Sequence, residues 1–171
     1  MTRFLQNRAI YEEVLLKLVP ETTDFLWIAT ADIKDLHVSD HGNFRPFLGV
    51  LSDLVDRGVS IRLLHAKEPG PNFRKDYDLY PNLIQGLERN ICPRVHLKTI
   101  VVDGRAAYLG SANLTGAGMG AKSPDRRNFE SGIMTDEAEL LDGIMTQFDE
   151  IWMGARCDTC GRRDYCADPI A

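Results

Sequence analysis

The chain has 171 residues, 44% of them hydrophobic and 26% charged, which is enough for one well-buried globular domain. Its formal net charge of −5 argues against a protein coated in basic residues for bulk nucleic-acid binding, but it leaves room for a local positive groove. The sequence has no run of about eighteen apolar residues, so it predicts no membrane span. Residues 1–13 carry charges where a secretory signal needs an unbroken apolar region. We therefore expect a cytoplasmic protein.

The N-terminal part of the sequence predicts helices and strands in alternation. Residues 9–18 have helical apolar spacing, and residues 24–31 are apolar enough for a buried strand. Residues 47–57 repeat the helical pattern, and residues 59–64 predict another strand. A strand, a helix and a strand in this order indicate a parallel pair joined by a right-handed crossover.

The middle of the sequence predicts a loop and a short helix. Residues 66–76 are rich in residues that break regular structure, and their basic side chains are those of a solvated loop more often than of a substrate site. Residues 82–90 resemble a short helix.

Residues 95–102 alternate polar and apolar side chains, which predicts a strand with His96 and Lys98 on one face. Asp103-Gly104 is a strong signal for a tight turn, because this pair tolerates positive φ at both central positions. We therefore interpret Asp103 as a structural turn residue.

A two-residue turn would pair Val102 with Arg105 and set the register of a hairpin. His96 would then face Ser111, with Asn113 two places further on the same face. An imidazole, an ammonium, a hydroxyl and a carboxamide together would form a cradle for a tetrahedral phosphate. A lone histidine on a strand is usually only hydrogen-bonded or solvated, but the combined pattern favours the functional interpretation.

After the hairpin, residues 116–122 are glycine-rich, a strand runs to Met134, and residues 136–152 predict a final amphipathic helix. We expect the glycine-rich segment, with Arg126 and Arg127, to border a substrate groove and contact phosphates.

The pattern H-x-K-x4-D, ending at Asp103, followed by G-S-x-N at residues 110–113, resembles the phospholipase D superfamily. The resemblance covers about residues 24–152. It implies an α/β fold, a mixed central β-sheet flanked by helices, to which this chain adds a short cysteine-rich metal-binding tail. We expect a catalytic domain over residues 1–155 and the tail over residues 156–171.

The resemblance also implies roles for individual residues. His96 would attack phosphorus to form a phosphohistidine, or act as the acid, and Lys98, Ser111 and Asn113 would bind the phosphate. Glu130 matches the acidic residue that orients the histidine, although a plain surface glutamate is the alternative. No catalytic metal is implied.

Such a reaction needs two imidazoles, one neutral to attack and one protonated to donate. The chain has a single copy of the motif, because His37, His41 and His65 have no lysine two residues later. We therefore expect a twofold homodimer with one composite active site, similar to the short bacterial nucleases of the superfamily.

The sequence thus favours a metal-independent phosphodiesterase that cleaves nucleic acid, specifically an endonuclease, because short single-motif members resemble nucleases more than lipid enzymes. A phospholipase or phosphatidyl transferase is the nearest alternative, although no basic amphipathic helix with exposed aromatics indicates a lipid surface. A non-catalytic module that binds nucleic acid or a partner protein is the third hypothesis, and the intact motif argues against it. Neither DNA over RNA nor single over double strands is indicated.

The tail carries Cys157, Cys160 and Cys166 in the spacing C-x2-C-x5-C, and Cys92 is the only other cysteine. Four cysteines make one tetrathiolate set. Disulfides are rare in the cytosol, and a C-x-x-C redox pair usually opens a helix after a strand in a thioredoxin-like unit, which is not the context here, so metal is favoured over free thiols. An extended chain from Cys92 to His96 would separate the metal from the imidazole by about 13 Å, which predicts a structural centre.

The cysteine spacing matches two kinds of metal site. The C-x2-C-G turn is typical of a zinc knuckle, but zinc ribbons generally pair two such knuckles. The spacing with one distant upstream cysteine resembles the iron staple of RecB-type nucleases, which implies a [4Fe-4S] cluster. We therefore expect iron–sulfur, with structural Zn²⁺ as the alternative.

Overall fold

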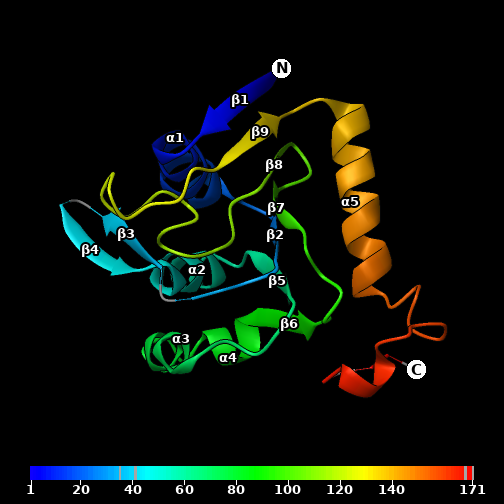
Figure 1. Cartoon of the computed structure of the whole chain (residues 1–171). Coiled ribbons are helices and arrows are strands. Elements are labelled where there is room, and N and C mark those ends of the chain that lie inside the picture. The colour runs from blue at the N-terminus through cyan, green and yellow to red at the C-terminus, as the bar shows by residue number, and fades with distance from the viewer. Residues whose placement is uncertain (35, 41, 168, 171) are drawn as a thin grey trace.

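The computed structural model describes residues 1–34, 36–40, 42–167 and 169–170, so His41 and two positions of the tail lie outside the described residues. The chain forms a mixed seven-stranded sheet with helices on both faces, and a separate two-stranded hairpin (Figure 1). The predicted fold class, α/β with a mixed central sheet flanked by helices, is confirmed.

In spatial order, the strands of the central sheet are β1 (Thr2–Gln6), β9 (Ser131–Thr135), β8 (Ala106–Gly110), β7 (Lys98–Val102), β2 (Phe25–Thr30), β5 (Ser60–His65) and β6 (Leu87–Ile91). The hairpin consists of β3 (His37–Asp40) and β4 (Asn43–Pro46). The helices are α1 (Arg8–Ile10) with its continuations η1 (Tyr11–Leu18) and η2 (Val19–Glu21), then α2 (Phe47–Asp56), α3 (Pro71–Tyr77), α4 (Leu83–Gly86), α5 (Ala138–Trp152) and η3 (Arg163–Tyr165).

The sheet changes direction at β2. This strand pairs in parallel with β5, as the strand–helix–strand order predicted, and β5 pairs in parallel with β6. On its other side β2 pairs antiparallel with β7, and the strands beyond it are also antiparallel. The central strands are apolar along their length because both faces of the sheet are covered.

Buried clusters lie on both faces of the sheet. The larger one joins η1 and α2 to the sheet, with Leu15, Leu51 and Ile100 among its buried members. On the other face, α5 places Leu141 and Phe148 against the sheet, and Trp27 stacks on Phe148 with ring centroids 4.9 Å apart. No helix within the described ranges is long and apolar enough to cross a membrane.

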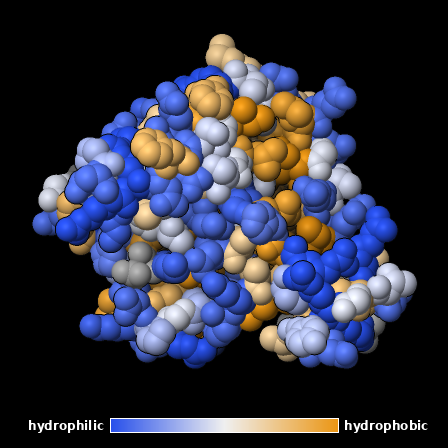
Figure 2. All heavy atoms as spheres, in the orientation of Figure 1, coloured by the Kyte–Doolittle hydropathy of each residue, from blue (hydrophilic) through white to orange (hydrophobic). Residues whose placement is uncertain are grey.

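One stretch of the sheet surface beside α5 stays exposed. Phe4 pairs with Ile133, which pairs with Leu109, so the three residues form a row across β1, β9 and β8. Phe4 is 68% exposed, and Leu109 and Leu140 are more than a third exposed. Figure 2 shows hydrophobic residues gathered in this region, between β8 and α5.

Several predicted elements differ from the structure. The predicted loop over residues 66–76 contains the start of α3, where Pro71 stands at the first turn and is well suited to begin a helix. Of the helix predicted over residues 82–90, only α4 is helical, and the remainder forms β6. Strand β1 was not predicted, since its mostly exposed residues lack a strong local pattern and depend on pairing with β9.

The Asp103-Gly104 turn forms as predicted, with φ of 53° and 61° and a hydrogen bond from Arg105 N to Val102 O. The predicted register is nevertheless wrong by one residue. Val102 pairs with Ala106, and Thr99 pairs with Leu109, because Arg105 is an extra residue in the loop. His96 precedes β7 instead of lying within it, so it does not pair with Ser111 across the hairpin.

The Asp103 side chain fastens this hairpin to the start of β2. Its carboxylate accepts hydrogen bonds from the backbone N–H groups of Thr23, Asp24 and Phe25, at 2.9–3.3 Å. Burial would raise the pKa of Asp103, but these bonds and one from Arg105 outweigh it, so the pKa lies below the usual aspartate value. The motif aspartate is therefore a structural residue, as we predicted.

We predict that Asp103→Ala lowers the free energy of unfolding at pH 7 by roughly 2–3 kcal/mol, because it leaves backbone donors without their charged acceptor. The stabilisation should be complete above the ordinary aspartate pKa of about 3.9 and be lost as the pH falls through the lower pKa of the folded state. Urea unfolding at several pH values measures both effects. Asp142→Ala, at an exposed position of α5, is the control, and equal losses in the two variants would contradict the assignment.

Candidate active site

The candidate site lies where the sheet changes direction. Thr30 at the end of β2 pairs with His65 of β5 on one side and with Lys98 of β7 on the other. The carboxyl ends of β2 and β5 therefore meet the amino end of β7. Ligands of open α/β sheets typically bind at carboxyl ends where the strand order switches.

Lys98 is a buried ammonium beside an exposed imidazole. Its side chain is 7% exposed, and Nζ lies 3.0 Å from Nδ1 of His96 and donates to the carbonyl oxygen of the same residue at 2.7 Å. Burial lowers the pKa of Lys98, and the negative charge of Glu130 opposes that shift. The imidazole and the ammonium are thus close enough to contact the same group of a ligand.

Asn113 is held by the loop that follows β2. Its Oδ1 accepts a hydrogen bond from Asp32 N at 3.1 Å, which leaves its amide N–H groups as donors for a ligand. The buried hydroxyl of Thr30 donates to Asp32 O at 2.8 Å and accepts from Leu114 N at 3.0 Å. Thr30 therefore ties together the two loops that carry Asp32 and Asn113.

Ser111 and Glu130 form a second polar group at the start of β9. Ser111 Oγ donates to Glu130 Oε2 and accepts from Ser131 N at 3.1 Å. Asn128 Nδ2 donates to the other carboxylate oxygen of Glu130 at 3.0 Å, and Asn7 Oδ1 accepts from Glu130 N at 3.0 Å. The carboxylate is thereby fixed in orientation.

The structure brings these predicted residues together in one region, although not through the predicted hairpin pairing of His96 with Ser111. Lys98 shares a small cavity with Thr30 and Ala112, the residue between Ser111 and Asn113, and it interacts electrostatically with Glu130. The hydrogen bonds of the Glu130 carboxylate go to Ser111 and Asn128. Its expected role in orienting His96 stays a prediction.

The other described histidines have different surroundings. His65 is fully buried, and its Nδ1 lies 2.8 Å from the carbonyl oxygen of Lys67. Burial lowers its pKa, and Arg89 adds to the shift, so His65 favours the neutral form inside the sheet. His37 stands exposed on the separate hairpin.

A cavity of about 470 Å³ adjoins the site through Asp32. Lys34 and Lys67 line it, and each pairs with the Asp32 carboxylate at 3.2 Å. Burial would raise the pKa of Asp32, but these two ammonium groups lower it overall. Glu68 lines the same cavity, so two carboxylates and two ammonium groups face it.

Sequence reasoning missed the residues that support the site. Thr30 is the one polar residue at the end of an otherwise apolar strand, which is a signal that could have identified it. Asp32 acts through its backbone N–H and Asn7 through its side-chain oxygen, and their partners are distant in the sequence, so no local pattern indicates them.

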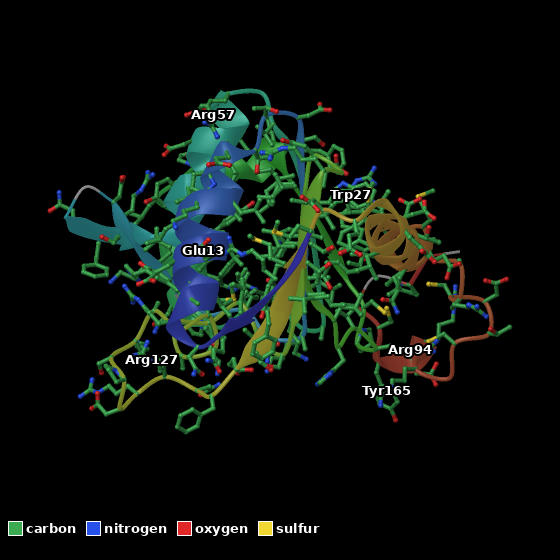
Figure 3. All side chains as sticks on the ribbon, turned by 90° about the horizontal axis from the view of Figure 1, so that it is seen from above. Glu13, Trp27, Arg57, Arg94, Arg127 and Tyr165 are labelled. Carbon is green, nitrogen blue, oxygen red and sulfur yellow. The ribbon has the colours of Figure 1, made fainter. Side chains whose placement is uncertain are left out.

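Arg127 lies on the loop before β9, on the far side of the sheet from Arg94 (Figure 3).

The four predicted metal ligands Cys92, Cys157, Cys160 and Cys166 are all half-buried free thiols. Among the described residues, no three His, Cys, Asp or Glu side chains are arranged, as they stand, to hold a metal ion.

Comparisons with known proteins place this chain in a family. The family model described as cardiolipin synthase, PLD-like domain, matches residues 15–152. No curated protein sequence matches the chain significantly.

Solved structures show the same fold at low identity. Nuc, a phospholipase D family member from Salmonella typhimurium, has a TM-score of 0.65 at 14% identity, covering 89% of this chain and 95% of that one. NucT from Helicobacter pylori has a TM-score of 0.61 at 13% identity, covering 89% and 96%. A phosphatidylserine synthase from Haemophilus influenzae has a TM-score of 0.62 at 15% identity, covering 88% of this chain but 38% of its own.

We predict that orthophosphate or tungstate binds at this site, and that Lys98→Met weakens binding roughly 10- to 100-fold, because a hydrogen bond to a charged group contributes roughly 1.5–3 kcal/mol. Isothermal titration calorimetry measures the affinity. Lys17→Met removes an ammonium that pairs with Glu13 on η1 and is the matched control. Equal affinity in the Lys98 variant and the control would show that the anion binds elsewhere.

Proposed function

The chain belongs to the phospholipase D superfamily, whose PLD-like domain model matches most of its length, and on this premise we propose that it is a metal-independent phosphodiesterase that cleaves nucleic acid. The observation that carries the proposal is the buried Lys98 ammonium in contact with the exposed His96 imidazole. A nucleophile and a fixed cation side by side suit attack on an anionic phosphodiester.

In the proposed reaction, a ring nitrogen of His96 attacks phosphorus, and the bond from phosphorus to the leaving oxygen breaks. Lys98, Asn113 and Ser111 hold the non-bridging oxygens while charge develops on them. A second imidazole, initially protonated, gives its proton to the leaving oxygen. The resulting neutral ring then removes a proton from water, which attacks the phosphohistidine and restores His96.

The second imidazole would come from His96 of another copy of the chain. Among the described histidines, His65 is enclosed in the sheet and His37 stands on the separate hairpin. Phe129, which precedes Glu130 at the site, is 97% exposed, and the apolar row of Phe4 and Leu109 is also uncovered. Exposed apolar surface of this kind suits contact with a second subunit across a twofold axis.

Two features support nucleic acid as the substrate. The chain spans nearly the full length of Nuc and NucT, so its size matches the short, single-motif members of the superfamily. Lys34 and Lys67 also line the cavity next to Asn113, where they could contact the phosphates that flank the cleaved bond.

Phosphatidyl transfer is the second candidate, favoured by the description of the family model and by the likeness to phosphatidylserine synthase. The chain spans a minor part of that synthase, so the comparison extends to one domain of it. Both reactions would use the same His96 chemistry and differ in what approaches the phosphate. The substrate panel described next separates them.

We predict that the purified protein cleaves labelled single-stranded or duplex DNA or RNA in the presence of EDTA, and that His96→Ala reduces turnover by at least about 10²-fold. Acid-labile phosphate bound to the chain during turnover would report the intermediate. His37→Ala, on the separate hairpin, is the matched control. Cleavage of a phosphatidyl lipid alone would favour the second candidate, and substantial activity in His96→Ala would exclude a histidine nucleophile.

We predict that a composite site loses activity steeply when subunits are mixed. If each reaction needs His96 from both copies, wild-type protein exchanged with an excess of His96→Ala should show activity that falls as the square of the wild-type fraction. Sedimentation equilibrium establishes the dimer under the same conditions. A linear fall, or full activity in a stable monomer, would contradict a shared site.

A further inference from the structure

The fold brings all four cysteines of the chain to one corner, although Cys92 lies far from the others in sequence. Cys166 Sγ contacts the carbonyl oxygen of Ile91, the residue before Cys92, at 3.8 Å. Cys160 Sγ lies 3.8 Å from Nη1 of Arg94. The C-terminal tail therefore lies along the short segment that leads from β6 to β7, and Figure 3 shows Arg94 beside the part of the tail that carries Tyr165.

The tail is folded back on itself without a core. None of its described residues is buried. Its conformation depends on polar contacts instead: Arg163 Nη1 donates to the carbonyl oxygens of Cys157 and Ile170, both at 3.1 Å, and Arg162 donates to Pro93 O at 3.2 Å. Small segments with so little apolar burial usually need a disulfide or a metal to hold one conformation.

The surroundings of the thiols suit metal ligation. Cys160 N donates to Cys157 O at 3.2 Å, which closes a tight turn with both thiols on it. Cys160 Sγ accepts a hydrogen bond from Arg162 N at 3.4 Å. Backbone donors to a cysteine sulfur are the kind of outer contact that stabilises a thiolate ligand.

We propose that Cys92, Cys157, Cys160 and Cys166 bind one metal centre through four thiolates, either a zinc ion or an iron–sulfur cluster, and that the centre fastens the tail to the segment before β7. No three of these side chains are yet placed as a ligand set, so binding includes rotation of the thiols and a shift of the exposed tail. Cys92 itself packs against the buried cluster that contains Val95 and Phe148, which gives the centre a rigid anchor.

The centre is a structural one. The sequence-based separation of about 13 Å between Cys92 and His96 assumed an extended chain. Val95 N in fact donates to Cys92 O at 2.9 Å, so the chain turns here and the separation is smaller. The thiolates fill the coordination of the metal, and His96 contacts Lys98 instead.

The experiment is metal analysis of the full chain, purified anaerobically, with thiol titration and hydrogen exchange of the tail. We expect either a brown protein with about four irons per chain, or a colourless one with about one zinc. Cys92→Ser and Cys166→Ser should each lose the metal and speed amide exchange in the tail roughly tenfold or more. Thr159→Ser, in the same turn as Cys157 and Cys160, should keep it.

Two results would overturn the proposal. One is a wild-type chain that binds neither metal after anaerobic reconstitution with Zn²⁺ or with Fe²⁺ and sulfide, and whose four thiols all react freely. The other is unchanged metal content in each cysteine variant. Because metal content is measured directly, either result is independent of whether the chain cleaves nucleic acid.

Discussion

The burial of one ammonium group determines how the candidate site is arranged. Lys98 begins β7 in the interior of the sheet, where an unpaired charge is strongly unfavourable, so the surrounding structure must supply acceptors and negative charge. The carbonyl oxygen of His96 is one such acceptor, and Glu130 provides the charge. Ser111 and Asn128 in turn fix the Glu130 carboxylate by hydrogen bonds. The segments that carry these residues are therefore linked, through Glu130, to the Lys98 ammonium.

The H-x-K-x4-D pattern spans the whole of β7, and its residues have different roles at the two ends of the strand. His96 and Lys98 lie at its amino end with the other groups of the candidate site, whereas Asp103 lies beyond its carboxyl end and holds the start of β2. The four intervening residues, 99–102, are all buried and form most of the strand. The spacing of the motif is therefore the length of a strand, and its last residue secures the pairing of β7 with β2, which places Lys98 beside Thr30.

This division explains what the sequence could and could not predict. Local patterns predicted the helices and strands whose apolar spacing is strong, and the motif identified residues that do gather in one region. The register of the hairpin depended on whether Arg105 belongs to the turn or to the strand, which two positive φ values alone do not decide. Asp32 acts through its backbone N–H, a role that side-chain identity does not record. Asn7 acts through its side-chain oxygen, but its partner Glu130 is far away in the sequence, so no local pattern indicates the contact.

The segment between β6 and β7 connects the two features that the sequence singled out. Its residues run from Cys92 through Arg94, which contacts the tail, to His96. Val95 is buried against Phe148 of α5, so the backbone on which His96 stands is held by the core. The tail contacts the first half of this short turn and the ligand would contact the second. If the tail binds a metal as we propose, the order that the metal imposes would reach the imidazole through a few backbone bonds, without contact between the metal and the phosphate.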